Sequence, residues 1–356
     1  MRKRLFLLIL ASLLIVLGCS AAPKDKVVVG FYNVENLFDT VHDEGKSDQQ
    51  FLPDGQNLWT EEKYASKLGN IARVINEMAT ENGGVYHSVL GLAEVENDRV
   101  LGDLVSHKSL ASAGYKFIHF ESPDARGIDC ALLYRPSDFK PLESRAIPFD
   151  FLNTDIRFEK TPAEQAEFAT RDVLMVRGKL KGEMFAFFVA HLPSRIGDKG
   201  SDLRERGAEI IHRKAMELMA AYPGIKIVVM GDMNDNPGDE SMSRYLRGAD
   251  SPEGLSAKDF FNPFVRMHRD GLGSEEYRGE WNIFDIIMVN STLCNPEVKG
   301  LKISRIGDKY HGRIFNPAFL TQQSGKYKGT PLRTFSAGAF INGYSDHYPT
   351  YIILTK

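Results

Sequence analysis

Short runs of apolar, mostly β-branched and aromatic residues recur along the chain, and they restrict its possible folds more than any other feature. Runs of this length and composition, bounded by turn-forming residues, are typical of buried β-strands. They cover residues 27–32, 89–92, 128–134, 173–180, 184–190, 225–230, 284–289 and 351–354. The sequence therefore predicts a protein built around β-sheets.

Two amphipathic helices are expected between these runs. Thr60 precedes Glu61 and Glu62, and apolar residues then follow at three- and four-residue spacing as far as Met78, as in a capped helix. A second pattern covers residues 202–222 and is stopped by Pro223 and Gly224. Strands that alternate with helices indicate an α/β fold.

The remaining features favour one domain. Residues 181–183 would join two apolar runs as a hairpin, so the sheets are expected to be mixed. We find no linker, internal repeat or low-complexity segment, and we expect a single α/β domain over residues 27–356. A composition with 43% hydrophobic and 26% charged residues excludes long disorder, collagen-like repeats and coiled-coil rods. The net charge of -3 means that a polyanionic ligand must meet a local basic patch.

The amino terminus is expected to be an export signal over residues 1–18. Arg2, Lys3 and Arg4 precede an apolar stretch over residues 5–17, which is too short for the hydrocarbon core of a bilayer, about 30 Å thick. Its end, Val-Leu-Gly-Cys, resembles the processing site of bacterial lipoproteins. That resemblance implies a lipid on Cys19 and a short tether over residues 19–26. The protein would be anchored to a bacterial membrane and face the periplasm or the exterior; simple secretion is the alternative.

Polar residues that end or follow these runs are the main functional signal. They are Asn33, Glu94, His191, Asp232 and Asn234, and Asp346 and His347 introduce the last run. Any one of them alone is more often a turn residue, but their joint occurrence predicts a polar site held by rigid strands. Oxygen donors such as Glu94, Asp346 and Asn33 favour Mg²⁺, with Mn²⁺ or Ca²⁺ as alternatives, over Zn²⁺. Phosphate ester cleavage is the chemistry that such a set would serve.

The sequence resembles the endonuclease/exonuclease/phosphatase superfamily, the deoxyribonuclease-like metal-dependent phosphoesterases. Six segments carry the resemblance in the family's order, and they extend over nearly the whole predicted domain. They are Phe31-Tyr32-Asn33-Val34, Leu92-Ala93-Glu94-Val95, Ala190-His191-Leu192, Gly231-Asp232-Met233-Asn234, Trp281-Asn282-Ile283-Phe284-Asp285 and Ser345-Asp346-His347. The resemblance implies a four-layer sandwich of two packed mixed β-sheets flanked by helices, with the active site at one edge of the sheets.

The same resemblance implies a role for each matched residue. Glu94 would be the principal metal ligand, supported by Asn33 and Asp346. His347, oriented by Asp285, would be a general base or an imidazole that binds the phosphate. Asp232 would position the attacking water, and Asn234 and His191 would contact the scissile phosphate.

Two arginines are further candidates for binding a substrate phosphate. Arg195 follows Pro193, which fixes the loop close to His191. Arg126 introduces a predicted strand, where a surface salt bridge is an equally good interpretation.

Family membership would leave the substrate open, because the same chemistry serves nucleic acids, phospholipids, sphingomyelin and small phosphate esters. The segment 299–345 carries eight Lys and Arg residues against one Asp, with aromatic residues between them. Such a segment can bind phosphates and stack on unpaired bases, or its aromatic residues can pack against the domain. We expect a nucleic acid substrate and therefore a nuclease. Alternatives are a phospholipid phosphodiesterase, a small-molecule phosphatase and a surface binding lipoprotein without activity; no protein partner is inferred.

Overall fold

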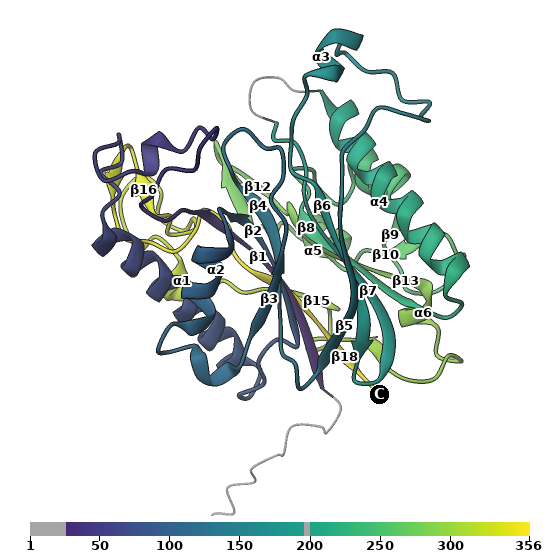
Figure 1. Cartoon of the computed structure of the whole chain (residues 1–356). Helices are drawn as coiled ribbons and strands as arrows, with labels where there is room; N and C mark the ends of the chain where they lie inside the picture. Colours follow the sequence, from purple (N-terminus) through teal and green to yellow (C-terminus); the bar gives the residue numbers. More distant parts are fainter. Residues whose placement is uncertain (1–25, 196–199) are drawn as a thin grey trace, which may run out of the picture.

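Two large mixed β-sheets pack face to face and form the centre of the molecule (Figure 1). The structure is a computed structural model, which describes residues 26–195 and 200–356. The predicted signal peptide and Cys19 lie outside the described residues, as does all of the predicted tether except Lys26. Among the described residues, no helix has the length and apolar character needed to span a bilayer.

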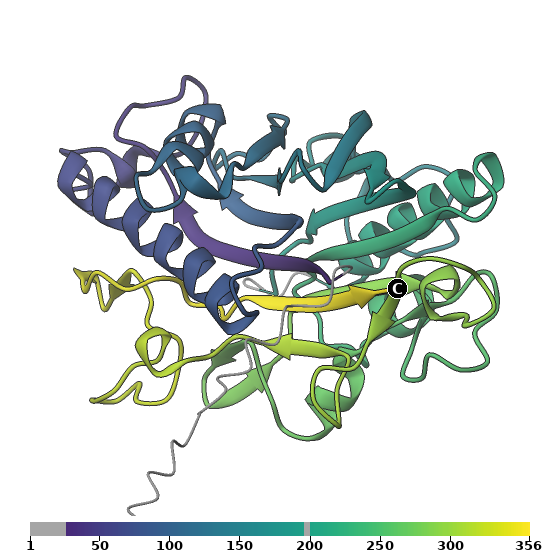
Figure 2. The same cartoon turned by 90° about the horizontal axis from the view of Figure 1, so that it is seen from below.

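The first sheet has the strand order β14-β18-β1-β2-β4-β3, and β15 also pairs with β18. β1 runs parallel to β2 and antiparallel to β18, although β18 comes at the end of the chain. Figure 2 shows these two strands, from opposite ends of the described chain, side by side. The strands are β14 (Lys302–Ser304), β18 (Thr350–Thr355), β1 (Val27–Leu37), β2 (Val89–Val95), β4 (Asp129–Tyr134), β3 (Lys116–His119) and β15 (Gly312–Ile314).

The second sheet has the strand order β5-β6-β7-β8-β13-β10-β9. β6 and β7 form the expected hairpin, and β7 then runs parallel to β8. The strands are β5 (Phe139–Ile147), β6 (Val173–Leu180), β7 (Glu183–His191), β8 (Lys226–Asp232), β13 (Asp285–Asn290), β10 (Phe260–Phe261) and β9 (Gly248–Ala249). Two small hairpins lie outside the sheets, β11 (Glu275–Tyr277) with β12 (Glu280–Asn282) and β16 (Phe335–Ser336) with β17 (Ala339–Phe340).

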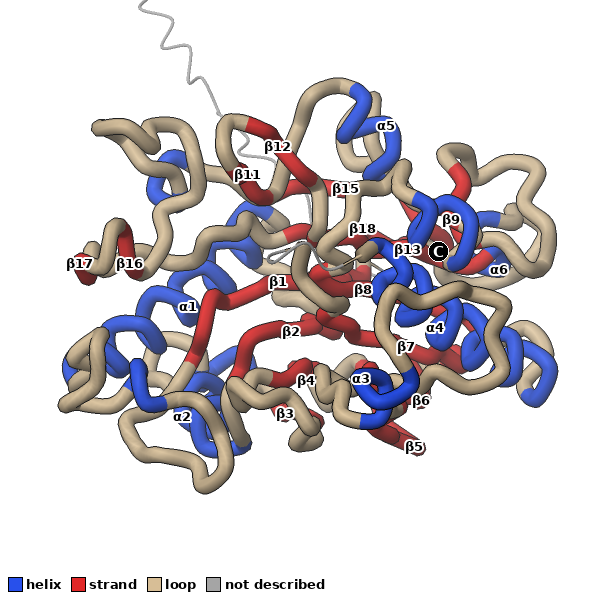
Figure 3. The backbone as a smooth tube through the Cα atoms, turned by 90° about the horizontal axis from the view of Figure 1, so that it is seen from above, coloured by secondary structure: helices blue, strands red, loops and turns tan. Residues whose placement is uncertain are grey.

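Helices cover the outer faces and complete the four layers (Figure 3). α1 (Glu61–Glu81) and α2 (Asp98–Ser106) lie on the side of the first sheet, and α4 (Ser201–Ala221) lies on the side of the second. Between the sheets the packing is close: a Cβ on Gly91 of β2 would lie 2.7 Å from Met230 Sδ of β8. The shorter helices are α3 (Pro162–Ala166), α5 (Phe264–Arg269) and α6 (Ser291–Cys294).

All eight apolar runs are strands, and both amphipathic patterns are helices, so these predictions are confirmed. Thr60 occupies the N-cap position of α1, but its side chain makes no hydrogen bond to the helix backbone. Apart from the strands of two or three residues, the sequence missed β3 and β5. β5 lies at the edge of its sheet and buries only its end residues, Phe139 and Ile147, so it lacks a continuous apolar run.

Candidate active site

Strand register brings most of the predicted site residues together at one edge of the sandwich. His191, the last residue of β7, pairs with Asp232, the last residue of β8, and Asp232 pairs on its other side with Asp285, the first residue of β13. Asn33 of β1 pairs with Ala93 of β2, next to Glu94. Each of these polar residues is held within a hydrogen-bonded strand rather than in a free loop, so its position is well determined.

Asn33 connects the two sheets at this edge. Its Nδ2 atom donates to Asp232 Oδ2 at 2.9 Å and lies 3.3 Å from Glu94 Oε1. The backbone N–H of Asn36 donates to the other carboxylate oxygen of Glu94, at 2.9 Å. Glu35, Asn36 and Glu94 all have positive φ, a conformation that non-glycine residues rarely adopt and that clusters at functional sites.

His347 lies beside the two aspartates of the second sheet. Its Nδ1 atom is 2.7 Å from Asp285 Oδ2, and its Nε2 atom is 3.8 Å from Asp232 Oδ2. Burial alone would lower the pKa of His347, but the carboxylates of Asp285 and Asp232 outweigh it and raise this pKa well above 6.5. The imidazole is therefore an imidazolium at neutral pH. Ser274 Oγ donates to Asp285 Oδ2 at 2.6 Å and helps to fix that carboxylate.

His191 has the opposite protonation state. Burial, together with the charges of Arg171 and Arg126, lowers the pKa of His191 well below 6.5, so its ring is neutral. Its Nε2 atom lies 3.6 Å from Asp232 Oδ2 and 4.0 Å from Glu94 Oε1. The site thus holds one neutral and one protonated imidazole on either side of Asp232, whose own pKa is raised by burial and by Asp285.

Asn234 and the loop after His191 are fixed to each other. Asn234 Nδ2 donates to Leu192 O at 3.0 Å, and its backbone N–H donates to Asp232 Oδ1 at 3.0 Å. Asn234 has φ of 50°, in the left-handed region that asparagine tolerates better than most residues. It is buried at the same edge as the two histidines, as predicted from its position after Asp232.

Arg171 is a buried residue of the site that the sequence did not reveal. Its guanidinium donates to His191 O at 3.2 Å and Leu192 O at 2.9 Å, and it pairs with Asp124 at 3.0 Å. It therefore holds the segment that carries His191. No local pattern could have identified it, because its carboxylate partner lies 47 residues earlier in the chain.

The two predicted phosphate-binding arginines differ in their surroundings. Arg195 donates to Asn234 O at 2.7 Å and pairs with Asp235 and Asp239, so its charge is already balanced at the rim of the site. Arg126 is exposed and lies 3.8 Å from Asp124, as in a surface salt bridge. It is still close enough to lower the pKa of His191.

Asp346 lies at the rim of the site. Its Oδ1 atom is 4.0 Å from His347 Nε2, and its Oδ2 atom pairs with Arg333 at 2.7 Å. Arg333 also lies 3.3 Å from the buried carboxylate of Glu35, which in turn accepts a hydrogen bond from the backbone N–H of Thr334. These contacts tie the segment before His347 to the end of β1.

The donor set of this edge fits a divalent cation. Within the described part of the chain, Glu94 has no lysine or arginine in ion-pair contact, and its nearest basic group is the neutral His191. A carboxylate without a lysine or arginine partner, near the second carboxylate of Asp232, suits a hard cation that binds oxygen. The Asn33 amide orients both carboxylates through Nδ2, while its Oδ1 accepts from the Glu35 N–H at 2.9 Å. A separate group, His119, Glu121 and Asp129, lies by β3 and β4 and has ligand atoms within 4.8 Å of one another. There both ring nitrogens of His119 already contact carboxylates, those of Asp98 and Asp129.

Comparisons with known proteins agree with this architecture. The family model described as the endonuclease/exonuclease/phosphatase family matches residues 28–356. A search of curated proteins finds no significant match. Among solved structures, TDP2 of D. rerio in complex with a single-strand DNA product aligns with a TM-score of 0.53 and 16% identity, covering 93% of this chain and 99% of that chain.

Two further solved structures align with similar TM-scores. The mannosyl-6-phosphatase of Bacteroides thetaiotaomicron has a TM-score of 0.53 and 16% identity over 93% of this chain and 100% of that chain. The catalytic domain of human Nocturnin with bound sulfate has a TM-score of 0.51 and 15% identity over 94% of this chain and 96% of that chain. At these identities the alignments establish the shared fold.

Proposed function

Because the chain belongs to the endonuclease/exonuclease/phosphatase family, whose members are phosphoesterases, we propose that it is a divalent-metal-dependent hydrolase that cleaves phosphodiester bonds of nucleic acid. The observation that carries this proposal is the protonated His347, held by Asp285 beside Asp232, Asn33 and Glu94. A fixed positive charge in the same site as Glu94, a carboxylate with no lysine or arginine in ion-pair contact among the described residues, fits the hydrolysis of a phosphate ester.

The metal site would consist of Glu94, with Asn33 and Asp346 in support. Mg²⁺ is the ion that this oxygen donor set favours, and Mn²⁺ or Ca²⁺ are alternatives. When bound, such an ion polarises a phosphoryl oxygen and neutralises charge on the phosphate.

The protein's own groups would handle the protons and the substrate charge. His347 would donate a hydrogen bond from Nε2–H to a phosphoryl oxygen, because Asp285 holds its Nδ1 side and keeps the ring charged. Asp232, oriented by Asn33 and by the backbone N–H of Asn234, would position the attacking water and accept its proton. His191 and Asn234, at the same edge, would contact the phosphate.

A substrate panel with matched variants tests this proposal. The purified protein is incubated in Mg²⁺ with plasmid DNA, RNA, sphingomyelin and mannose 6-phosphate, and the release of each product is measured. We expect nucleic acid cleavage that is lost in His191→Ala and Asp232→Ala, while His212→Ala serves as the control because His212 lies on α4 and bonds Lys258 O. Hydrolysis of sphingomyelin or of the sugar phosphate alone would support the alternative substrates instead.

We further propose that the protein is exported and anchored to a membrane by a lipid on Cys19. The basic residues, the short apolar stretch and Val-Leu-Gly-Cys support this proposal. Labelling of cells with a tagged fatty acid should mark the wild-type protein and leave Cys19→Ala unmarked. An equally labelled Cys19→Ala variant would contradict the proposal.

A further inference from the structure

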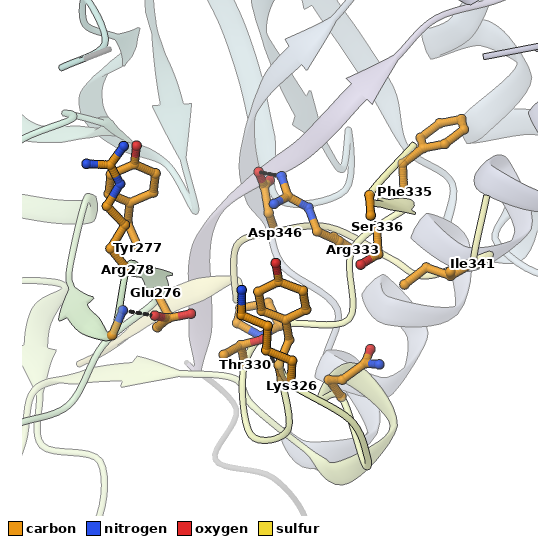
Figure 4. Close-up of a pocket in the computed structure, with 15 residues that line it drawn as sticks. Glu276, Tyr277, Arg278, Lys326, Thr330, Arg333, Phe335, Ser336, Ile341 and Asp346 are labelled. Atoms are coloured by element: carbon orange, nitrogen blue, oxygen red, sulfur yellow. Dashed lines mark hydrogen bonds and ion pairs between the residues drawn. The ribbon is translucent and has the colours of Figure 1, made fainter. Parts of the chain in front are cut away.

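A cavity of about 600 Å³ adjoins the candidate active site. Three segments line it: the turn between β11 and β12, a loop around Lys326 and Tyr327, and the segment from Arg333 to Asp346. Figure 4 shows Asp346 and Arg333 in contact at the centre of this view, above Lys326, with Tyr277 and Arg278 of the hairpin to the left. Its size lies within the range of ligand pockets, and Asp346 is shared with the candidate active site.

Two tyrosines of this cavity are unusually uncovered. Tyr277 is 52% exposed and Tyr327 is 47% exposed, although large aromatic side chains normally bury most of their surface. Tyr327 belongs to the basic segment 299–345, whose other aromatic residues are mostly packed: Phe315 is buried, and Phe335 contacts Trp59. The available aromatic surface of that segment therefore concentrates at this cavity.

Unpaired cations accompany both tyrosines. The Arg278 guanidinium lies 5.0 Å from the ring centre of Tyr277, and Lys326 Nζ lies 5.3 Å from that of Tyr327. Within residues 26–195 and 200–356, neither cation has a carboxylate in ion-pair contact. Other basic residues nearby are engaged, Lys309 with Asp270 and Arg313 with Glu81. Two charges that no carboxylate balances thus lie beside the uncovered rings.

Arg278 also occupies a backbone position that favours other residues. It has φ of 55° and is followed by Gly279 with φ of 91°, so the two residues form the turn of the β11–β12 hairpin. Such turns prefer asparagine or glycine, because a side chain with a Cβ is strained there. The Glu276 carboxylate accepts a hydrogen bond from the Gly279 N–H and fixes the turn. The turn therefore fixes the backbone of Arg278 at the edge of the cavity.

We propose that this cavity binds an unpaired nucleotide next to the scissile phosphate, so that the protein prefers single strands and overhangs to base-paired substrate. The inference rests on the proposed nuclease function and specifies its substrate. Tyr277 and Tyr327 would stack on the base, and Arg278 and Lys326 would bind its phosphate. A base within a duplex is already stacked on its neighbours, so its faces are not free for these rings.

The test measures binding and turnover with separate substrates. Binding of a fluorescent single-stranded oligonucleotide and of its duplex is measured by anisotropy in EDTA, without turnover. Hydrolysis of the single strand in Mg²⁺ is compared with that of bis(p-nitrophenyl) phosphate, a small diester without a base. The variants are Tyr327→Ala, Lys326→Ala and Arg278→Asn, which removes the charge and keeps a residue that the turn prefers. Lys328→Ala is the matched control, since Lys328 is two residues from Lys326 and does not line the cavity.

We expect the single strand to bind at least tenfold more tightly than the duplex. Tyr327→Ala should weaken single-strand binding about tenfold, since stacking of a base on an aromatic ring contributes that much or more. Each cavity variant should also lower kcat/KM for the oligonucleotide relative to the small diester, and Lys328→Ala should change neither. Thermal melting of each variant checks that it remains folded.

Equal binding of single strand and duplex, or unchanged binding in Tyr327→Ala, would overturn the nucleotide cavity. If the small diester is cleaved in that case, the proposed phosphodiesterase chemistry still stands. If instead the oligonucleotide binds through the cavity but no phosphate ester is cleaved, the proposed function fails and the cavity stands. Hydrolysis of mannose 6-phosphate that Tyr327→Ala lowers, without binding of the oligonucleotide, would assign the cavity to a sugar phosphate and overturn the inference.

Discussion

His87 is a fully buried histidine, and its burial predicts a specific dependence of stability on pH. It lies just before β2, its ring contacts Tyr351, and neither ring nitrogen has a hydrogen-bond partner among the described residues. Burial, with a smaller effect of Lys26, lowers the pKa of His87 to about 3. A free histidine has a pKa of about 6.5, so folding requires this ring to be neutral.

The magnitude follows from the linkage between proton binding and folding. Because the pKa is lower in the folded state, the stability due to neutral His87 is fully present above about pH 6.5 and is lost as pH falls from there toward 3. At pH 5.5 the loss is about 1.4 kcal/mol, and at pH 4.5 it is about 3 kcal/mol. Replacing His87 with leucine removes this term, because leucine does not titrate.

Urea unfolding of the wild type and His87→Leu at pH 7.5, 5.5 and 4.5 measures the effect. We expect the free energy of unfolding to fall more steeply with acid in the wild type, by about 1 kcal/mol per pH unit below 6.5. His87→Gln is the control that keeps a polar side chain without titrating, and it should share the shallow slope of His87→Leu. Other buried groups such as His191 contribute equally to all three proteins. Parallel slopes for the wild type and both variants would refute the reasoning.

Further predictions concern the active site. Asp285→Asn removes the carboxylate that holds the His347 imidazolium, so hydrolysis should fall at least 100-fold. The alkaline limb of the pH–rate profile should also move to lower pH, because the raised pKa of His347 returns toward 6.5. An unmoved limb would contradict this assignment. Removal of divalent ions with EDTA should abolish turnover, and Mg²⁺ should restore it. Glu94→Gln should need far more Mg²⁺ than the wild type for its half-maximal rate. Glu280→Gln, on the exposed β11–β12 hairpin, is the control. Arg171→Leu should destabilise the protein by about 3 kcal/mol in urea unfolding, because it leaves the buried Asp124 with only the exposed Arg126 as a cationic partner. Adding Asp124→Asn to Arg171→Leu should recover part of that loss, and no recovery would place the cost elsewhere.

Much of the candidate site could be predicted from the sequence, because each polar residue lies at or next to the end of an apolar run. Asn33, His191 and Asp232 are placed by strands that the sequence reveals, and strand register then brings them together. Arg171 and Glu35 could not be found in this way. Their partners, Asp124 and Arg333, lie far away in the chain, and one charged residue before or within a strand has many surface interpretations.

For the basic segment 299–345, too, the sequence predicted only part of what the structure shows. Its composition indicated either a nucleic acid surface or packing against the domain, and the structure shows that part of the segment packs while other side chains stay exposed. Phe315 is buried and Lys309 and Arg313 are paired with acids, whereas Tyr327 and Lys326 remain uncovered at the cavity. Composition counts side chains, but which of them stay available depends on partners contributed by distant segments.

The sequence by itself determined the α/β class, the eight main strands and the two long helices, because hydrophobic periodicity is a local property that burial then enforces. It also determined that polar side chains would stand at the strand ends. Only the tertiary structure decided their protonation states: His347 is charged because Asp285 and Asp232 face it, and His191 is neutral because burial and Arg171 act on it. Those states depend on charges that are adjacent in space and distant in the chain, and only the packing of one sheet on the other places them.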